Sequence, residues 1–162
     1  MSHYRVGQGW DTHRLAAGRA LILGGVTVQS DLGLEGHSDA DILTHAITDA
    51  LLGAAALGDI GMHFPNTDPL WKDTKSAVFL GHALTLVHQA GYELVNVDST
   101  VILERPKLKE YRMPIRESLA ATLRIPLDCV SVKFKTAEGE GPVGERRTAE
   151  AQAIVTLRRM EP

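Results

Sequence analysis

The order of strand-like and helix-like segments is the feature that most constrains the fold of this chain. Two strand-like segments precede the first helix-like one, and strands and helices then alternate. A doubly wound sheet would instead place a helix after each strand. We therefore expect an α+β fold in which one layer of helices packs on a mixed four- to five-stranded sheet. The chain of 162 residues fits a single domain, residues 1–162, and can bury a sizeable core.

The expected strands are short apolar or alternating runs between turn formers. The clearest is residues 92–103, whose two faces are both substantially apolar toward its end, so we expect it inside the sheet. In residues 20–28, the pair Gly24-Gly25 indicates a bulge or a close backbone approach. The five expected strands cover residues 4–11, 20–28, 92–103, 129–136 and 149–158.

The expected helices are bounded by capping and turn residues. The first should begin at Ser38, a good N-cap, and end near Leu57. The second should span residues 76–90, and the third should end near Leu123 with a proline in its first turns. Residues 59–69 are rich in turn formers and are expected to form a binding loop.

Composition narrows the class of protein. The net charge of −3 comes from 17 basic and 20 acidic residues, so we expect neither a nucleic acid nor a membrane surface as partner. The most apolar stretch, residues 42–57, is too short to span a bilayer and is interrupted by His45 and Asp49. We expect no signal peptide. A single cysteine, Cys129, excludes an internal disulfide, suits the cytoplasm and is expected to be a small buried side chain.

Three side chains form a candidate metal centre. In an extended strand, residues i and i+2 point to the same face, so Asp11 and His13 can reach one ion. His45, in the first turns of the first helix, offers a third ligand. Taken singly, the carboxylate is more often a turn or cap residue, and each histidine is more often a surface or core residue. Together, one carboxylate and two imidazoles suit zinc with an open fourth position.

Several longer motifs carry a family resemblance. They are Gly9-Trp10-Asp11-Thr12-His13, Gly36-His37-Ser38-Asp39-Ala40-Asp41, Thr48-Asp49-Ala50-Leu51-Leu52-Gly53-Ala54, Gly58-Asp59-Ile60-Gly61, Phe64-Pro65-Asn66-Thr67-Asp68-Pro69 and Arg105-Pro106-Lys107. From about residue 5 to residue 157, the chain resembles the 2-C-methyl-D-erythritol 2,4-cyclodiphosphate synthases. The resemblance implies a phosphorus-oxygen lyase of the non-mevalonate isoprenoid pathway. Such an enzyme converts 4-diphosphocytidyl-2-C-methyl-D-erythritol 2-phosphate into the cyclic diphosphate and CMP. It also implies a homotrimer with active sites between subunits.

The resemblance also assigns roles to residues. It implies zinc at Asp11, His13 and His45, with magnesium or manganese between the substrate phosphates and on Glu138. His37 and Thr136 would stabilise the transition state as the catalytic residues. The implied substrate-binding residues are Asp11, His13, His37, Ser38, Asp59, Ile60, Gly61, Phe64, Pro65, Asn66, Thr67, Asp68, Leu103, Glu104, Arg105, Pro106, Lys107, Leu108, Lys109, Lys135, Thr136, Ala137 and Glu138.

One segment departs from the family pattern. Where many members carry a phosphate-binding arginine, this chain reads Val143-Gly144-Glu145-Arg146-Arg147-Thr148, and either arginine could supply the missing charge. Two other functions stay open. A zinc-dependent hydrolase of a nucleotide diphosphate would use the same candidate ligands and release linear phosphates. A non-catalytic binding module, for instance one that senses an isoprenoid in a trimer's central cavity, would bind its ligand without needing His13.

The remaining histidines and aromatic residues are expected to have structural roles. We expect Trp10 and Trp71 to pack, and Asp49 to orient a neighbouring side chain. Three histidines are not expected to bind metal: His63, His82 and His88.

Overall fold

The computed structural model describes residues 3–65, 67–71 and 74–161. Its main sheet has five strands in the order β4-β1-β7-β5-β6. They are β1 (Tyr4–Ala17), β4 (Leu32–Leu34), β5 (Tyr92–Ile102), β6 (Val130–Lys135) and β7 (Thr148–Arg159). The β5–β6 pair is parallel and the other pairs are antiparallel, so the expected mixed sheet is confirmed. β5 lies between β7 and β6, as its two apolar faces predicted.

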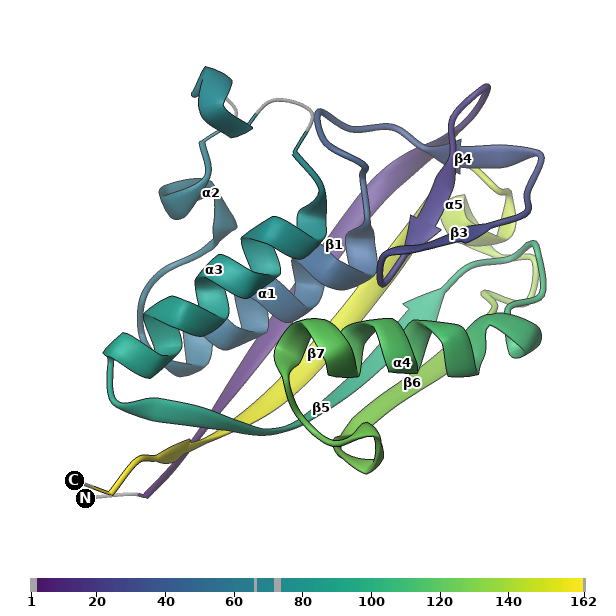
Figure 1. Ribbon diagram of the computed structural model, residues 1–162. Helices are drawn as coiled ribbons and strands as arrows, with labels where there is room; N and C mark the ends of the chain where they lie inside the picture. The colour runs from purple at the N-terminus through teal and green to yellow at the C-terminus, as the bar shows by residue number, and fades with distance from the viewer. Residues whose placement is uncertain (1–2, 66, 72–73, 162) are drawn as a thin grey trace.

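The three long helices cover one face of this sheet (Figure 1). They are α1 (Ile42–Ala54), α3 (Ser76–Gln89) and α4 (Arg112–Leu123). α1 lies on β1 at glycines: a Cβ added to Gly9 would stand 1.8 Å from the Ala46 carbonyl oxygen, and one added to Gly7 would stand 2.0 Å from that of Ala50. The strand and helix can approach this closely because neither glycine has a side chain. The expected single helical layer is confirmed.

The segment expected as one strand at residues 20–28 is a hairpin, so that prediction was wrong. β2 (Leu21–Leu23) pairs with β3 (Val26–Val28) across the Gly24-Gly25 turn. Both glycines have positive φ, 58° and 78°. A two-residue turn with both φ values positive reverses the chain and twists with the strands, which suits Gly-Gly.

The first helix is shorter than predicted. It begins at Ile42, and its N-cap is Asp41, not Ser38. Ala40 has a φ of 54°, in the left-handed region, so the residues before it cannot belong to the helix. At the other end, Ala56 is also left-handed, with a φ of 59°, which ends the helix before Leu57.

Short elements occupy the connections. α2 (Ile60–His63) lies within the expected loop 59–69, and η1 (Pro69–Trp71), η2 (Lys109–Tyr111), η3 (Leu127–Cys129) and α5 (Gly141–Gly144) follow. Cys129 is half-buried at the end of η3, just before β6, so the expectation of a buried strand residue was wrong. The expected second and third helices are confirmed as α3 and α4. None of the helices in the described ranges is long and apolar enough to cross a bilayer.

The two tryptophans behave differently. Trp71 stacks edge-on against Phe64, with ring centroids 5.0 Å apart, so its packing role is confirmed. Trp10 is 50% exposed, contrary to expectation. The reason is the alternation of side chains along the strand: Gly9 faces α1, so its neighbour Trp10 points to the opposite sheet face, which none of the described helices covers.

The ends of the described chain lie side by side (Figure 1). Tyr4 of β1 is paired with Arg158 of β7, and the Arg159 amide donates to the His3 carbonyl over 2.8 Å. The C-terminal strand β7 is the central strand of the sheet, with β1 on one side and β5 on the other.

Candidate active site

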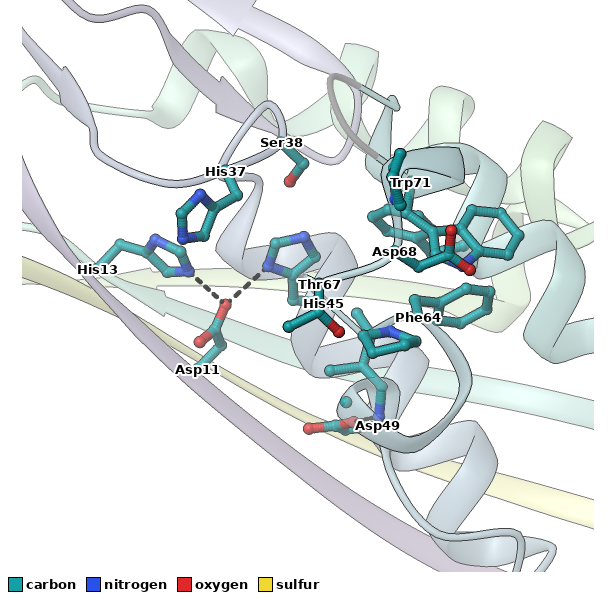
Figure 2. Close-up of a pocket in the computed structure, with 15 residues that line it drawn as sticks. Asp11, His13, His37, Ser38, His45, Asp49, Phe64, Thr67, Asp68 and Trp71 are labelled. Atoms are coloured by element: carbon teal, nitrogen blue, oxygen red, sulfur yellow. Dashed lines mark hydrogen bonds and ion pairs between the residues drawn. The ribbon is translucent and has the colours of Figure 1, made fainter.

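The three candidate metal ligands meet at one point (Figure 2). Asp11 Oδ2 lies 3.1 Å from His13 Nε2 and 3.0 Å from His45 Nδ1. Their ligand atoms all lie within 4.8 Å of one another. Asp11 and His13 alternate along β1, and His45 comes from the first turn of α1, which Gly7 and Gly9 allow to lie directly on that strand. The predicted convergence is confirmed.

Each imidazole is held at its far nitrogen. His13 Nδ1 contacts the Glu35 carbonyl oxygen, which can only accept, so Nδ1 carries a hydrogen, and in the neutral ring Nε2 has a lone pair to offer a metal. His45 Nε2 contacts the Ser76 hydroxyl at 2.8 Å, with Nδ1 turned to Asp11. Such outer contacts orient histidine ligands around metals. The donor set of one carboxylate oxygen and two imidazole nitrogens fits a first-row divalent ion such as zinc.

The electrostatics of the group favour a charged carboxylate. Burial alone raises the pKa of Asp11, but hydrogen bonds and charge from His13 and His45 outweigh it and lower the pKa to about 2. Asp11 accepts a hydrogen bond from the protonated His13 ring, which raises the pKa of His13 above its usual value, against the opposing effect of burial. A negative oxygen at this point is suited to a cation, whether the cation is a proton on an imidazole or a metal ion.

A cavity of about 840 Å³ opens beside the three ligands. Figure 2 shows the ligands at one end and Phe64 and Trp71 at the other. Phe64 also packs against Phe79 of α3, with ring centroids 4.8 Å apart. The predicted site residues that line the cavity besides the triad are His37, Ser38, Ile60, Gly61, Phe64, Pro65, Thr67 and Asp68.

Sequence reasoning missed part of this lining. Pro69 and Phe79 were not predicted as site residues, and Trp71 was expected only to pack, yet all three line the cavity. Phe79 lies on the buried face of α3, so its sequence position signals a core residue only. Asn66, a predicted site residue, lies outside the described residues.

Two carboxylates accept hydrogen bonds from backbone amides of residues 60–62, next to the cavity. Asp49 Oδ1 accepts from the Ile60 amide at 2.7 Å, so it orients backbone, where a neighbouring side chain was predicted. Asp59 caps α2, accepting from the Met62 amide at 3.0 Å. Asp59 is exposed and is not among the residues that line the cavity.

The remaining predicted site residues form a second group. The Leu103 amide donates to the Lys135 carbonyl over 2.9 Å, and the Ala137 amide donates to Glu104 Oε2 over 3.0 Å. The Thr136 hydroxyl contacts Glu138 Oε1 at 3.0 Å. The structure therefore brings residues 103–109 and 135–138 together.

Three residues of this second group, Arg105, Pro106 and Lys107, line a hollow of about 450 Å³ together with Asp31 and Arg146. Leu103 and Leu108 are buried in the core, so they can offer a ligand only backbone groups. Lys109 opens η2 at the surface. Of the two candidate replacement arginines, Arg146 faces this hollow and pairs with Asp31 at 2.6 Å, whereas Arg147 pairs with Glu145.

The two groups do not meet within one chain. Thr136 and Glu138 are not among the described residues that line the larger cavity, and Glu138 is not part of the metal-ligand cluster there. Glu138 is left-handed, with a φ of 52°, an uncommon conformation for a residue with a side chain. Such conformations persist where the surrounding structure requires them.

A family model and the sequences of known proteins match almost the whole chain and indicate one family. Residues 4–158 match the YgbB family. The chain is 69% identical to the 2-C-methyl-D-erythritol 2,4-cyclodiphosphate synthase of Solibacter usitatus, over 97% of this chain and 99% of that protein. It is 58% identical to the synthase of Gloeobacter violaceus, over 94% of each.

A solved structure agrees with these sequences. A 2-C-methyl-D-erythritol 2,4-cyclodiphosphate synthase in a CDP-bound form superposes with a TM-score of 0.89 at 43% identity, over 94% of this chain and 99% of that one. The fold, the ligand cluster and the sequence similarity along almost the whole chain all indicate the same protein family. The chain belongs to the YgbB family, that of the 2-C-methyl-D-erythritol 2,4-cyclodiphosphate synthases.

Proposed function

We infer that this protein converts 4-diphosphocytidyl-2-C-methyl-D-erythritol 2-phosphate into 2-C-methyl-D-erythritol 2,4-cyclodiphosphate and CMP. The observation that carries this inference is the Asp11–His13–His45 cluster at one end of the cavity, in a chain 69% identical to a synthase of that name. In this reaction the 2-phosphate oxygen attacks the β-phosphorus, and the bond from that phosphorus to the CMP oxygen breaks. The substrate supplies its own nucleophile, so the protein has to position and neutralise anionic groups.

Zinc is the metal we assign to Asp11, His13 and His45. When bound there, it would act as a Lewis acid on a β-phosphate oxygen. His37 and Ser38 line the cavity next to the cluster, where they can contact phosphate oxygens. Of these two, we assign His37 to transition-state stabilisation, because an exposed imidazole beside the cluster can donate to a developing negative charge.

We assign the remaining parts of the substrate to the cavity lining and to the second group of residues, 103–109 and 135–138. Phe64, Pro65, Thr67 and Asp68 would surround the methylerythritol phosphate, and the exposed carboxylate of Asp59 would accept from the ribose hydroxyls. Residues 103–109 would hold cytosine, with Lys107 near phosphate. Thr136 would be the second transition-state residue. Glu138 would bind magnesium or manganese between the phosphates, since hard cations prefer oxygen ligands.

This assignment requires a second copy of the chain. The metal cluster lines the larger cavity, which Glu138 does not line, so a site that uses both would combine the larger cavity of one copy with residues 103–109 and 135–138 of another. The uncovered face of β1 and β7 exposes apolar side chains: Val6 at 68%, Trp10 at 50% and Ile154 at 49%. We propose that this face packs around the axis of a homotrimer and borders a central cavity able to take an isoprenoid.

Residues 1–162 would then be one catalytic domain per subunit. A single buried cluster receives side chains from the main sheet and from all three long helices, which supports this division. We place the enzyme in the cytoplasm, where a half-buried free thiol such as Cys129 stays reduced.

A phosphorus NMR assay tests the reaction. Purified protein with zinc, magnesium and the diphosphocytidyl substrate should give the paired signals of a cyclic diphosphate and one CMP per product. Asp11→Ala should lower turnover at least about a hundredfold, because two ligands hold zinc poorly. Linear phosphates without the cyclic product would instead identify a hydrolase and contradict the proposal.

Mixing variants tests the shared site. His13→Ala lacks a proposed metal ligand in the larger cavity, and Glu138→Ala lacks one in the second group, residues 103–109 and 135–138. Each should be nearly inactive alone. After the two are unfolded and refolded together, some interfaces combine the intact cavity of one copy with the intact Glu138 of its neighbour, so activity should return. Refolding each variant with itself is the control, and no recovery in the mixture would mean that each site lies within one chain.

A further inference from the structure

His45 has two ring nitrogens with opposed surroundings. Nδ1 faces the Asp11 carboxylate at 3.0 Å, on the side of the proposed metal. Nε2 lies 2.8 Å from the hydroxyl of Ser76. A neutral imidazole carries one hydrogen, so the group that attracts this hydrogen decides which nitrogen keeps a lone pair. Left to itself, the Asp11 carboxylate would draw the hydrogen to Nδ1, the nitrogen that has to bind the metal.

The position of Ser76 opposes that effect. It is the first residue of α3 and is completely buried. Its hydroxyl contacts Asp39 Oδ1, and its amide donates to Asp39 Oδ2 over 3.0 Å. A carboxylate can only accept, so Asp39 takes the single hydroxyl hydrogen of Ser76. The serine oxygen is then left as an acceptor, and its partner is the hydrogen on His45 Nε2.

Asp39 is held by its surroundings as well. It also accepts from the Asp41 amide at 3.3 Å, two residues further along the loop that leads into α1. On the other side it caps the first amide of α3, a helix whose own N-cap residue, Lys75, makes no side-chain capping bond. The carboxylate thereby ties the loop before α1 to the start of α3, and the aligned amides of α3 favour its negative charge.

We propose that Asp39 and Ser76 are positioning residues, which hold the hydrogen of His45 on Nε2 and keep the Nδ1 lone pair available for the metal. The inference rests on the proposed metal site at Asp11, His13 and His45. Neither Asp39 nor Ser76 lines the cavity, so both act through His45 without touching substrate. The order of contacts is Asp39, Ser76, His45, and then the metal position.

Ser76→Ala is the decisive variant, because it removes the hydroxyl and keeps the amide that Asp39 caps. Zinc affinity, measured by competition with a chromophoric chelator, should fall about tenfold to a hundredfold. The cobalt(II) absorption spectrum of the variant should change with the ligand geometry. Ser99→Ala is the matched control: Ser99 is also buried, and its hydroxyl donates to the Ser131 carbonyl on β6, so its loss should leave zinc affinity unchanged.

Nitrogen NMR of the metal-free protein shows which ring nitrogen of His45 carries the hydrogen. A purely structural role of Ser76 would leave this position unchanged. In its neutral form, the His45 ring of the wild type should carry its hydrogen on Nε2. In Ser76→Ala the hydrogen should move to Nδ1, toward Asp11. Asp39→Asn should shift the same equilibrium in the same direction, and it replaces Ser76→Ala if that variant does not fold.

The outcomes distinguish the proposed metal site from the proposed positioning role of Asp39 and Ser76. Wild-type zinc affinity and an unchanged hydrogen position in Ser76→Ala would overturn the positioning role while leaving the metal site intact. If the wild type binds no zinc, the proposed metal site fails, and the position of the His45 hydrogen in the metal-free proteins then decides the role of Ser76 and Asp39 alone.

Discussion

At the scale of single residues, the carboxylate of Asp41 holds together two distant parts of the chain. Oδ1 accepts from the amides of Gly24 and Thr44 at 2.9 and 3.0 Å. Oδ2 accepts from the Gly25 amide at 2.7 Å and the Thr44 hydroxyl at 2.8 Å. Complete burial raises the pKa of Asp41 although these four hydrogen bonds act to lower it. The group therefore fixes the β2–β3 turn against the start of α1.

Asp41→Asn should destabilise the protein by about 2–4 kcal/mol. The amide nitrogen of asparagine donates, so it would face donors where the carboxylate accepts, and a buried amide would lose its partner. Urea unfolding at neutral pH measures the change. The exposed Asp128→Asn is the control and should stay within about 0.5 kcal/mol of the wild type. An equally small effect of Asp41→Asn would contradict this view of the carboxylate.

At the scale of elements, the contact between β1 and α1 sets the distance between the metal ligands. Asp11 and His13 come from the strand, and His45 comes from the helix. Gly7 and Gly9 let the helix backbone touch the strand, with no room for a side chain between them. The geometry of the metal cluster therefore depends on two residues that carry no chemistry of their own.

Gly9→Ala should cost at least about 3 kcal/mol of stability and weaken zinc binding, because its methyl group would strike the backbone at Ala46. Gly53→Ala is the matched control in α1: its methyl group would meet only the Gln8 carbonyl, at 3.9 Å. That change should be neutral or stabilising by up to about 1 kcal/mol, since alanine favours helix. Thermal unfolding and zinc titration of both variants check the contrast, which fails if Gly9→Ala behaves like Gly53→Ala.

A strand-to-strand ion pair predicts a pH dependence. Asp98 of β5 lies 2.6 Å from Lys133 Nζ of β6. Partial burial raises the pKa of Asp98, but the hydrogen bond and charge of Lys133, with further hydrogen bonds from Ser131 and Ser99, outweigh it and hold the pKa below 3.8. A lowered carboxyl pKa stabilises the folded state above pH 3.8, and this contribution is lost as pH falls through the folded pKa.

Lys133→Met should therefore be less stable than the wild type at neutral pH, by less than about 1 kcal/mol because both groups are exposed. The difference should vanish in acid, once Asp98 is protonated. Urea unfolding at both pH values measures it. Lys75→Met, also at an exposed lysine, should show no such pH-dependent difference. A difference that persists in acid would exclude the ion pair as its cause.

Elements and ligands were predictable from the sequence to different degrees. The strand period placed Asp11 beside His13, and helix spacing placed α3 and α4 correctly. The left-handed Ala40 could not be foreseen, since alanine normally favours helix, so the cap was misplaced from Asp41 to Ser38. The contact of Ser76 with His45 joins residues 31 positions apart, and local patterns cannot reveal such pairs.

At the scale of the whole molecule, the helices of the described residues cover one face of the sheet and leave the other uncovered (Figure 1). The proposed trimer uses the uncovered face, so Ile154→Glu should produce monomers, detected by light scattering after size-exclusion chromatography. Activity should fall with assembly, whereas zinc binding should persist because the three ligands come from one chain. Val78→Glu is the control, since Val78 is 51% exposed on α3, on the helical side. A trimeric Ile154→Glu would contradict the proposed interface.

The adjacent ends of β1 and β7 also bear on how the chain could be connected. Because Tyr4 pairs with Arg158, and the His3 carbonyl accepts from the Arg159 amide, a loop of a few residues could join the two ends as an ordinary hairpin. The circular chain could then be opened in the exposed turn around Arg124, between α4 and β6. Such a circular permutant should keep every strand neighbour and all three metal ligands. The order in which the strands are synthesised would change, and the site would not.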